Sequence, residues 1–307
     1  MGDVDESQRK QPITAADVEA AAQRVVDSPQ GSHWVRGGEL DLGDKRWRPH
    51  AASPEGKRLL YVLLQDEIPR FARERLEAAF NCGFSATIAL ELASLYKPDV
   101  IKMLTSIDAN VIVLDDHNKS RQLEPRELLT ALADTEVPLP PDLRRQAAAK
   151  TLERIEDGTP QEKGKKLESL LAFLFSQVND LKVVERNYRN ETEEIDLVLQ
   201  VTNPSSRCWQ IPGCPFILVE AKNRVDKAEQ HVVSTLMTKL QTKRGTAKIA
   251  LLISLRGFTE GARMQEMRFS TGDVCIVMID RSQLETILNA DDLDEELESA
   301  IRRAQLR

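Results

Sequence analysis

Short apolar runs alternate with helical patterns along most of this chain, and this alternation narrows the folds that it can adopt. From residue 57 to residue 118 the order is strand, helix, strand, helix, strand, with RLLYVLLQ, SATIALEL and ANVIVLDD as the strands. This order is typical of a parallel sheet with crossover helices. We therefore predict a small α/β module here, with one ambiguity: TIALELASLY also fits a helix.

A second alternation begins at Lys163. The helical pattern KKLESLLAFLFSQV carries its apolar residues on one face, and two strand-like runs follow it, LKVVERNY and EEIDLVLQV. Further along come FILVEAKN, a helical pattern, AKIALLISL, another helical pattern and VCIVMID. This order predicts a second α/β domain.

Two stretches are the best candidates for a domain boundary. One is the proline-rich joint at 138–141, and the other is DGTPQEKG at 157–164. We predict three parts: an N-terminal helix and irregular segment at 1–56, an α/β and helical module at 57–158, and a C-terminal domain at 159–307. In the first part, Thr14 is the expected helix cap. Trp34 and Trp47 are expected to pack the irregular segment onto the body of the protein.

Composition excludes several classes of protein. Hydrophobic residues make up 41% of the chain and charged residues 30%, which is ordinary for a soluble globular protein. No apolar run approaches the roughly 18 residues needed to cross a bilayer, and the polar N-terminus lacks the apolar core of a secretion signal. The four cysteines are scattered, as is common in a reducing cytosol. We therefore predict a cytoplasmic protein that does not bind membranes.

The charge is unevenly distributed. The formal net charge of -7 argues against a chain coated in nucleic acid. However, lysine and arginine are concentrated between Lys163 and Lys248, while the run DDLDEELES supplies much of the negative charge. A local basic surface is therefore compatible with the acidic total. The alternative is a set of solvated charges on helix faces.

The strand FILVEAKN ends in an acid and a base. Side chains alternate across a strand, so Glu220 and Lys222 point to one face. If this strand pairs with EEIDLVLQV, then Asp196 lies beside Glu220. Two adjacent carboxylates repel each other unless protons or a cation intervene, and Mg²⁺ prefers such oxygen ligands. A lysine beside the cation can orient a water, and the cation stabilises charge on a scissile phosphate.

These residues are therefore candidates for metal-assisted phosphodiester hydrolysis. The alternative is a solvated, charged strand edge, because Asp, Glu and Lys are common residues. Two features favour the catalytic interpretation. Both acids interrupt strands that are otherwise apolar, and Glu168 lies on the preceding helix, from which a third carboxylate could reach the site.

At these motifs the sequence resembles the PD-(D/E)XK nuclease superfamily and, within it, the Mrr-like restriction endonucleases. The resemblance covers residues 160–280 and is carried by KGKKLESLLAFLF, EEIDLVL and ILVEAKN, with KIALLISLRGFTEGA similar to a later strand and turn. The proline that normally precedes the first acid is absent, since Ile195 stands there. The resemblance implies a restriction-endonuclease-like mixed sheet flanked by helices, preceded here by the small α/β and helical N-terminal part.

The resemblance also implies roles for individual residues. Asp196 and Glu220 would bind the metal, with the Ala221 carbonyl as a further ligand, while Lys222 would serve the attacking water and Glu168 would assist. The cofactor would be Mg²⁺, for which Mn²⁺ is expected to substitute, and the substrate would be DNA. The residues expected to contact nucleic acid are Lys166, Arg224, Gln230 and Arg256.

Other features have simpler interpretations. Cys208 and Cys214 flank Trp209, but two further zinc ligands at close spacing are lacking, so free thiols are expected. Trp209 either stacks on a base or packs on its own domain. The polar strand end with Asp115, Asp116 and His117 is either a ligand site or a turn, and no glycine-rich phosphate loop accompanies it.

Three hypotheses follow. The first is a Mg²⁺-dependent DNA endonuclease, with a role in bacterial restriction or anti-phage defence by family analogy. The second is a catalytically inactive subunit of the same fold that binds nucleic acid or acts as a scaffold in a defence complex. The third makes the N-terminal α/β module a nucleotide-binding sensor. A ligand or protein partner for residues 1–158 and a homo-oligomer are both compatible with the sequence.

Overall fold

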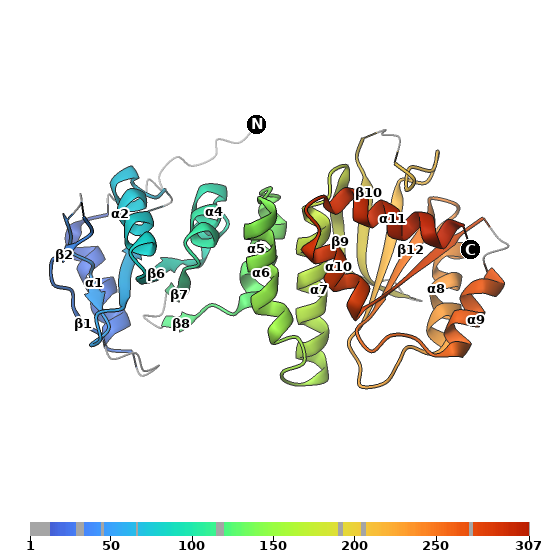
Figure 1. Cartoon of the computed structure of the whole chain (residues 1–307), viewed down its shortest axis with the longest axis horizontal. Coiled ribbons are helices and arrows are strands. Elements are labelled where there is room, and N and C mark those ends of the chain that lie inside the picture. The colour runs from blue at the N-terminus through green and yellow to red at the C-terminus, as the bar shows by residue number, and fades with distance from the viewer. Residues whose placement is uncertain are drawn as a thin grey trace, which may run out of the picture. The chain divides into compact units, whose positions relative to one another are not determined.

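A computed structural model describes residues 13–28, 34–43, 46–65, 67–114, 120–189, 193–203, 207–269 and 273–306. The chain divides into two compact units, Met1–Glu124 and Pro125–Arg307 (Figure 1). Within the described ranges, no helix combines the length and the apolar character needed to cross a membrane. The described elements form a mixed α/β fold with mixed sheets flanked by helices, as the sequence predicted.

The first unit is built on a six-stranded sheet in the order β1-β4-β5-β6-β7-β8. Its strands are β1 (Val35–Arg36), β4 (Ala51–Ala52), β5 (Arg58–Leu63), β6 (Ser85–Glu91), β7 (Asn110–Leu114) and β8 (Ser120–Gln122), and a small separate sheet joins β2 (Leu40–Asp41) to β3 (Arg46–Trp47). The three central strands β5, β6 and β7 run parallel, as predicted, while β4 and β8 are antiparallel to their neighbours.

The helices of this unit are α1 (Ala15–Val26), α2 (Arg70–Asn81), α3 (Leu92–Leu95) and α4 (Pro98–Ser106). Thr14 caps α1 in a reciprocal capping box with Asp17, as its position predicted. The ambiguous TIALELASLY segment is a strand followed by the single turn α3. Trp34 and Trp47 are both buried. Asp115, Asp116 and His117 lie outside the described residues.

The second unit contains a five-stranded mixed sheet in the order β13-β12-β11-β10-β9. Its strands are β9 (Leu181–Arg189), β10 (Glu194–Val201), β11 (Phe216–Lys222), β12 (Ala247–Ser254) and β13 (Cys275–Asp280), and its helices are α5 (Pro125–Thr135), α6 (Pro141–Glu153), α7 (Pro160–Ser176), α8 (Gln230–Thr242), α9 (Glu260–Phe269), α10 (Arg281–Asn289) and α11 (Leu293–Gln305). Strands β9, β10 and β11 pair antiparallel, whereas β11, β12 and β13 pair parallel.

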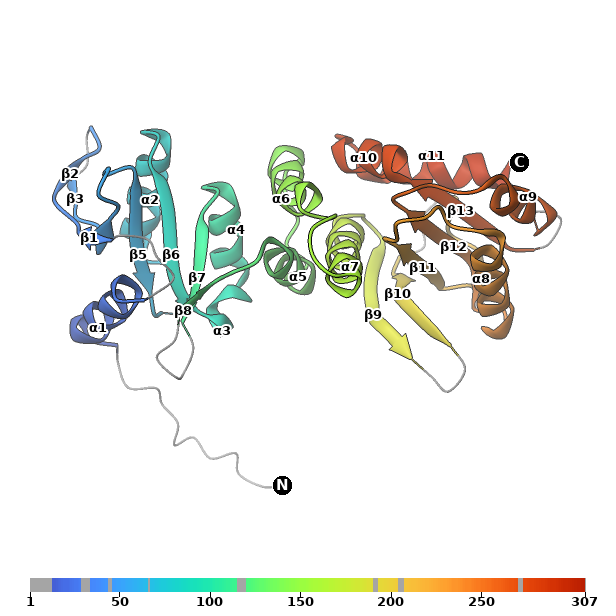
Figure 2. The same ribbon diagram turned by 90° about the horizontal axis from the view of Figure 1, so that it is seen from below.

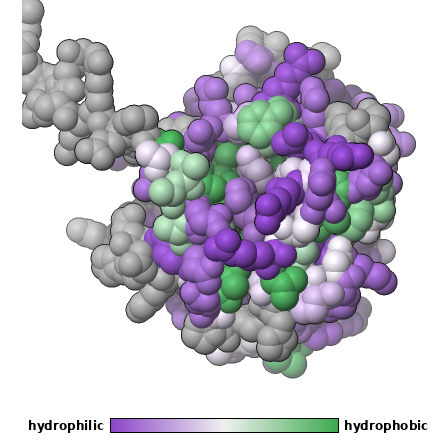
Figure 3. All heavy atoms as spheres, turned by 90° about the vertical axis from the view of Figure 1, so that its left-hand side faces the viewer, coloured by the Kyte–Doolittle hydropathy of each residue, from purple (hydrophilic) through white to green (hydrophobic). Residues whose placement is uncertain are grey.

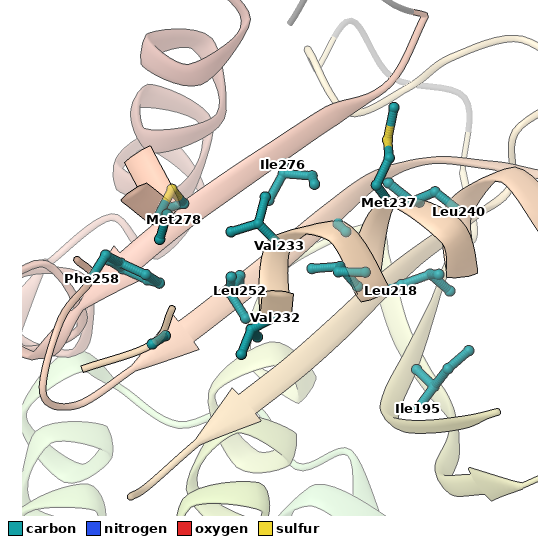
Figure 4. Packing of buried hydrophobic residues seen from close by; sticks show 14 of the residues in the cluster. Ile195, Leu218, Val232, Val233, Met237, Leu240, Leu252, Phe258, Ile276 and Met278 are labelled. Atoms are coloured by element: carbon teal, nitrogen blue, oxygen red, sulfur yellow. The ribbon is translucent and has the colours of Figure 1, made fainter. Parts of the chain in front are cut away.

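One hydrophobic cluster fixes α8 and α9 on this sheet (Figure 4). Val233 and Leu236 of α8 pack with Leu218 and Leu252 of the central strands, and all four are essentially inaccessible to solvent. On the opposite face lie α10 and α11, and α7 packs against β9, β10 and β11 (Figure 2). Strand β11 is therefore buried at the centre of the unit, which gives the residues at its end a rigid position.

The division of the chain differs from the predicted boundary at residue 159. Helices α5 and α6 belong to the second unit because they pack against α7. The stretch around 157–164 is the start of α7 rather than a linker: Thr159 and Glu162 form a capping box, and Pro160 occupies the first turn. The roles assigned to the three predicted segments stay predictions.

Gln177, at the end of α7, ties this helix to the segment between α5 and α6. Its Nε2 donates to the Val137 carbonyl at 3.0 Å, and its Oε1 accepts from the Leu139 N–H at 2.8 Å. We expect Gln177→Ala to lower the free energy of unfolding by about 1–3 kcal/mol, because it leaves two backbone groups unsatisfied. Urea unfolding measures this change. Gln305→Ala, at an exposed position, should stay within about 0.5 kcal/mol of wild type; an equal loss in both variants would contradict the assignment.

Candidate active site

Strand β11 carries Glu220 and Lys222 on one face of the sheet. The antiparallel register with β10 aligns Leu197 with Val219. One step further along the ladder, Asp196 stands opposite Glu220, so the two acids share a face. The structure therefore brings together the three residues that the sequence placed at one site.

Two lysines hold the Glu220 carboxylate. Lys222 Nζ donates to Oε1 at 2.5 Å, and Lys239 Nζ, from α8, donates to Oε2 at 2.6 Å. Glu220 and Lys239 are each only 8% exposed. An unpaired carboxylate at such a depth would be strongly destabilising, and two ammonium groups supply the charge and hydrogen bonds that it needs.

Asp196 is held by the backbone of the neighbouring strand. Its Oδ2 accepts a hydrogen bond from the Ala221 N–H at 2.6 Å. Burial and, to a smaller extent, the negative charge of Glu220 raise the pKa of Asp196 to about 6, while the Ala221 N–H and Lys222 oppose the shift. Asp196 therefore binds a proton at a higher pH than an ordinary aspartate does, and additional positive charge nearby would lower its pKa again.

Glu168 lies on α7 near these groups. Its negative charge contributes to the raised pKa of Asp196, although this contribution is smaller than those of burial and Glu220. The start of α7 is fixed to the end of β11 by Asn223, whose Nδ2 donates to the carbonyls of Ile155 and Lys163 at 2.9 and 3.0 Å. Asn223 therefore sets the position of α7, and with it Glu168, relative to Lys222.

The residues predicted to contact nucleic acid have different surroundings. The Lys166 ammonium group donates to the carbonyls of Arg154 and Asp157, so it satisfies backbone acceptors in the segment that follows α6. Arg224 is exposed on the loop after β11, and Gln230 is the exposed first residue of α8. Arg256 contacts the Glu156 carboxylate at 3.3 Å.

Two loops at the carboxyl ends of β11 and β12 bring Arg224, Gln230 and Arg256 into one region. The Ala228 N–H donates to the Gly257 carbonyl at 2.9 Å, and the Thr259 N–H donates to the Ala228 carbonyl at 3.0 Å. The Leu255 N–H also donates to the Lys222 carbonyl. The loops that carry Arg224 and Arg256 are thus joined at the end of the strand that carries Lys222.

The donor set is compatible with a hard divalent cation. Asp196 and Glu220 supply carboxylate oxygens on one face, and their mutual repulsion raises the pKa of Asp196. In the part of the chain that the structure describes, no group of three or more His, Cys, Asp or Glu side chains is arranged to hold a metal. Mg²⁺ needs only one or two carboxylates and keeps several waters, so the pair suffices. The Ala221 carbonyl stays a predicted ligand.

Lys239 and Asn223 were not predicted from the sequence to belong to this site. Lys239 lies on α8 among Val232, Leu236 and Leu240, positions that share the buried face of the helix. A lysine within an apolar helical stripe is the signal that could have identified it. Asn223 directly follows the predicted catalytic motif, but its partners lie 60 or more positions away, so no local pattern could identify them.

The Cys208–Cys214 loop packs within its own unit. Trp209 is 1% exposed and lies beneath the Arg207 guanidinium, so the packing interpretation is confirmed and base stacking is excluded. Arg207 also pairs with Asp294 and Glu298 of α11. Cys208 and Cys214 are free thiols, as expected.

Two comparisons with known proteins carry no argument about the second unit. The comparison with curated proteins found no match. Among solved structures, the chain is similar to protein VC1899 from Vibrio cholerae, with 13% sequence identity over 81% of this chain and 92% of that chain. The TM-score is 0.31, which is too low to support an argument about fold or function.

A protein-family model is more informative. The catalytic-domain model of the Mrr family, described as restriction endonuclease, matches residues 160–288. The matched segment begins with α7 and includes Asp196, Glu220, Lys222 and Lys239. Residues 160–288 therefore match the restriction endonuclease domain of the Mrr family, which belongs to the PD-(D/E)XK superfamily.

Proposed function

We propose that this domain is a Mg²⁺-dependent endonuclease that hydrolyses phosphodiester bonds in DNA. The observation that carries the proposal is the Asp196–Glu220–Lys222 group at the end of a buried central strand. A general restriction-endonuclease identity follows from the matched family. The metal, the substrate and the catalytic residues are proposals that rest on the donor set and its geometry.

Each residue has a distinct task in this proposal. Asp196 and Glu220 would hold the cation, and the cation would stabilise the charge that develops on the phosphate. Lys222 would leave Glu220 Oε1 and use its ammonium to orient the attacking water against the phosphorus atom. Glu168 would assist from α7 by orienting a water. Lys239 would hold Glu220 in place through Oε2.

The DNA backbone would lie across the carboxyl end of β11 and β12. Arg224, Gln230 and Arg256 lie on the loops and helix start at this end. Guanidinium groups bind phosphate oxygens strongly, and such contacts position a duplex without reading its sequence. Lys166 has a structural contact with two carbonyls, so its contribution to DNA binding would be the smallest of the four. By family analogy, we propose a role in bacterial restriction or anti-phage defence.

One observation favours a second function. Both oxygens of Glu220 are already bound by ammonium groups, so this carboxylate is satisfied without a cation. We propose as the second function a catalytically inactive subunit that binds nucleic acid or acts as a scaffold, because such a subunit would need the ion-paired carboxylate but no bound cation. Metal dependence separates the two functions, because a scaffold binds DNA equally well without divalent ions.

Lys222→Ala tests the nuclease proposal directly. We expect wild type to cut plasmid and linear DNA with Mg²⁺ or Mn²⁺ and to lose this activity in EDTA. Removal of the ammonium group should lower the cleavage rate at least about 100-fold. Lys182→Ala is a matched control, since this lysine pairs with Glu136 at the opposite end of the sheet. Equal rates in wild type and Lys222→Ala would reject the assigned role of Lys222.

The raised pKa of Asp196 predicts a pH-dependent stability. Because burial and the charge of Glu220 together raise this pKa from 3.8 to about 6, the folded chain binds more protons than the unfolded chain between these pH values. Ionisation of Asp196 therefore destabilises the fold as pH rises through this window. Asp196→Asn keeps an acceptor for Ala221 and removes the charge. In EDTA, we expect it to be more stable than wild type by roughly 1–3 kcal/mol above pH 6.

Urea unfolding at a series of pH values measures this difference. The stability gap should shrink as pH falls from 6 to about 4, because Asp196 then becomes neutral in both states. A wild-type protein that is more stable than Asp196→Asn at pH 7.5 in EDTA would show that Asp196 is not a destabilising buried charge.

A further inference from the structure

The two lysines that bind Glu220 differ in how firmly the protein holds them. Lys222 donates to Oε1 of this carboxylate, and Lys239 donates to Oε2. Lys222 is the last residue of β11, and its side chain is 18% exposed, whereas the side chain of Lys239 is 10% exposed. The ammonium of Lys222 can therefore turn toward solvent or a ligand, while Lys239 is enclosed by protein.

The surroundings of Lys239 offer its charge no second partner. Its neighbours on the buried face of α8 include Leu236 and Leu240, which belong to the hydrophobic cluster between this helix and the sheet. Among the described residues, Glu220 is the only acceptor of the Lys239 ammonium. Separation of the pair would leave a buried ammonium unpaired, which is strongly destabilising. Glu220 Oε2 therefore stays occupied when Lys222 leaves Oε1.

Asp196 also has one oxygen engaged by the protein. Its Oδ2 accepts the Ala221 N–H at 2.6 Å, and no hydrogen bond among the described residues involves Oδ1. Each carboxylate thus offers one oxygen to a cation, namely Asp196 Oδ1 and, once Lys222 has moved, Glu220 Oε1. Over the described ranges, no third acidic, histidine or cysteine side chain completes a larger metal-binding group.

A pair of cations needs more than these two oxygens supply. In two-metal sites the ions lie about 3.5–4 Å apart, close enough for one carboxylate to bind both. Here the second oxygen of Glu220 already has the Lys239 ammonium at 2.6 Å. A divalent cation on that oxygen would lie close to a buried positive charge, which solvent screens only weakly. The electrostatic cost of a second cation is therefore high.

We propose that Lys239 takes the place of a second metal ion and limits the site to one divalent cation. This inference rests on the proposed nuclease function, because it concerns the cation that Asp196 and Glu220 would hold. Lys239 acts through Glu220, so it is a positioning residue: it fixes Oε2 and leaves Oε1 to bind the cation.

The number of Mn²⁺ ions bound to each chain tests the proposal, measured on the full chain by equilibrium dialysis and by electron paramagnetic resonance. We expect one ion in wild type. In Lys239→Met we expect a second ion, or at least about tenfold tighter binding of the first, because a nearby positive charge is removed. Two Mn²⁺ ions that share a carboxylate couple magnetically, so the spectrum identifies a second ion at this site.

Two further variants are controls. Lys243→Met removes another lysine at the end of α8, which pairs with Glu193, and should leave the number and affinity of the ions unchanged. Glu220→Gln removes a proposed ligand, so the Mn²⁺ that it still binds is bound elsewhere. Such background binding is expected on hydrophilic surfaces like the face of the first unit in Figure 3. Circular dichroism checks that each variant is folded.

The outcomes separate this inference from the proposed function. Two ions in wild type would overturn the inference and leave the metal site in place, and this result does not depend on the folding of any variant. A folded Lys239→Met with the ion number and affinity of wild type would also overturn it. Wild type that binds no Mn²⁺ above the Glu220→Gln background would instead reject the metal site, and with it the proposed function.

Discussion

The buried ion pairs of Glu220 organise the second unit. This carboxylate lies at the end of the central strand and is bound by Lys222 of the same strand and by Lys239 of α8. A buried carboxylate is stable only with such partners, so the position of α8 and the chemistry of the site are linked. The group holds two carboxylates, of Asp196 and Glu220, and two lysines, so its formal charges balance. A cation at this point must compete with ammonium groups, which makes Lys239 a determinant of metal affinity.

Much of this site was predictable from patterns among residues that are close together in the sequence. The alternation of side chains along β11 was enough to place Glu220 and Lys222 on one face, and the apolar runs around Asp196 indicated a paired strand. Lys239 was not predictable in the same way, because its role depends on how α8 crosses the sheet. Lys166 shows the opposite case: its charge and position favoured nucleic acid, whereas its ammonium caps carbonyls of the preceding segment.

The division of the chain into its two compact units was not predictable for a related reason. Proline and glycine near 157–164 indicated a linker, yet Thr159 and Glu162 use the same stretch to begin a helix. The attachment of α5 and α6 to α7 depends on Gln177 and on packing between helices distant in sequence. In the first unit, the strands were predictable from their apolar residues.

Calorimetric titration of the full chain with Mn²⁺ tests the central claim most directly, because it measures the metal site without requiring a substrate or an activator. We expect Mn²⁺ to bind to wild type, to lose much of its affinity in Glu220→Gln, and to bind more tightly in Lys239→Met, which removes a competing ammonium group. Unchanged Mn²⁺ binding in Glu220→Gln, or no binding to wild type under any condition, would contradict the assignment of a metal-dependent nuclease site.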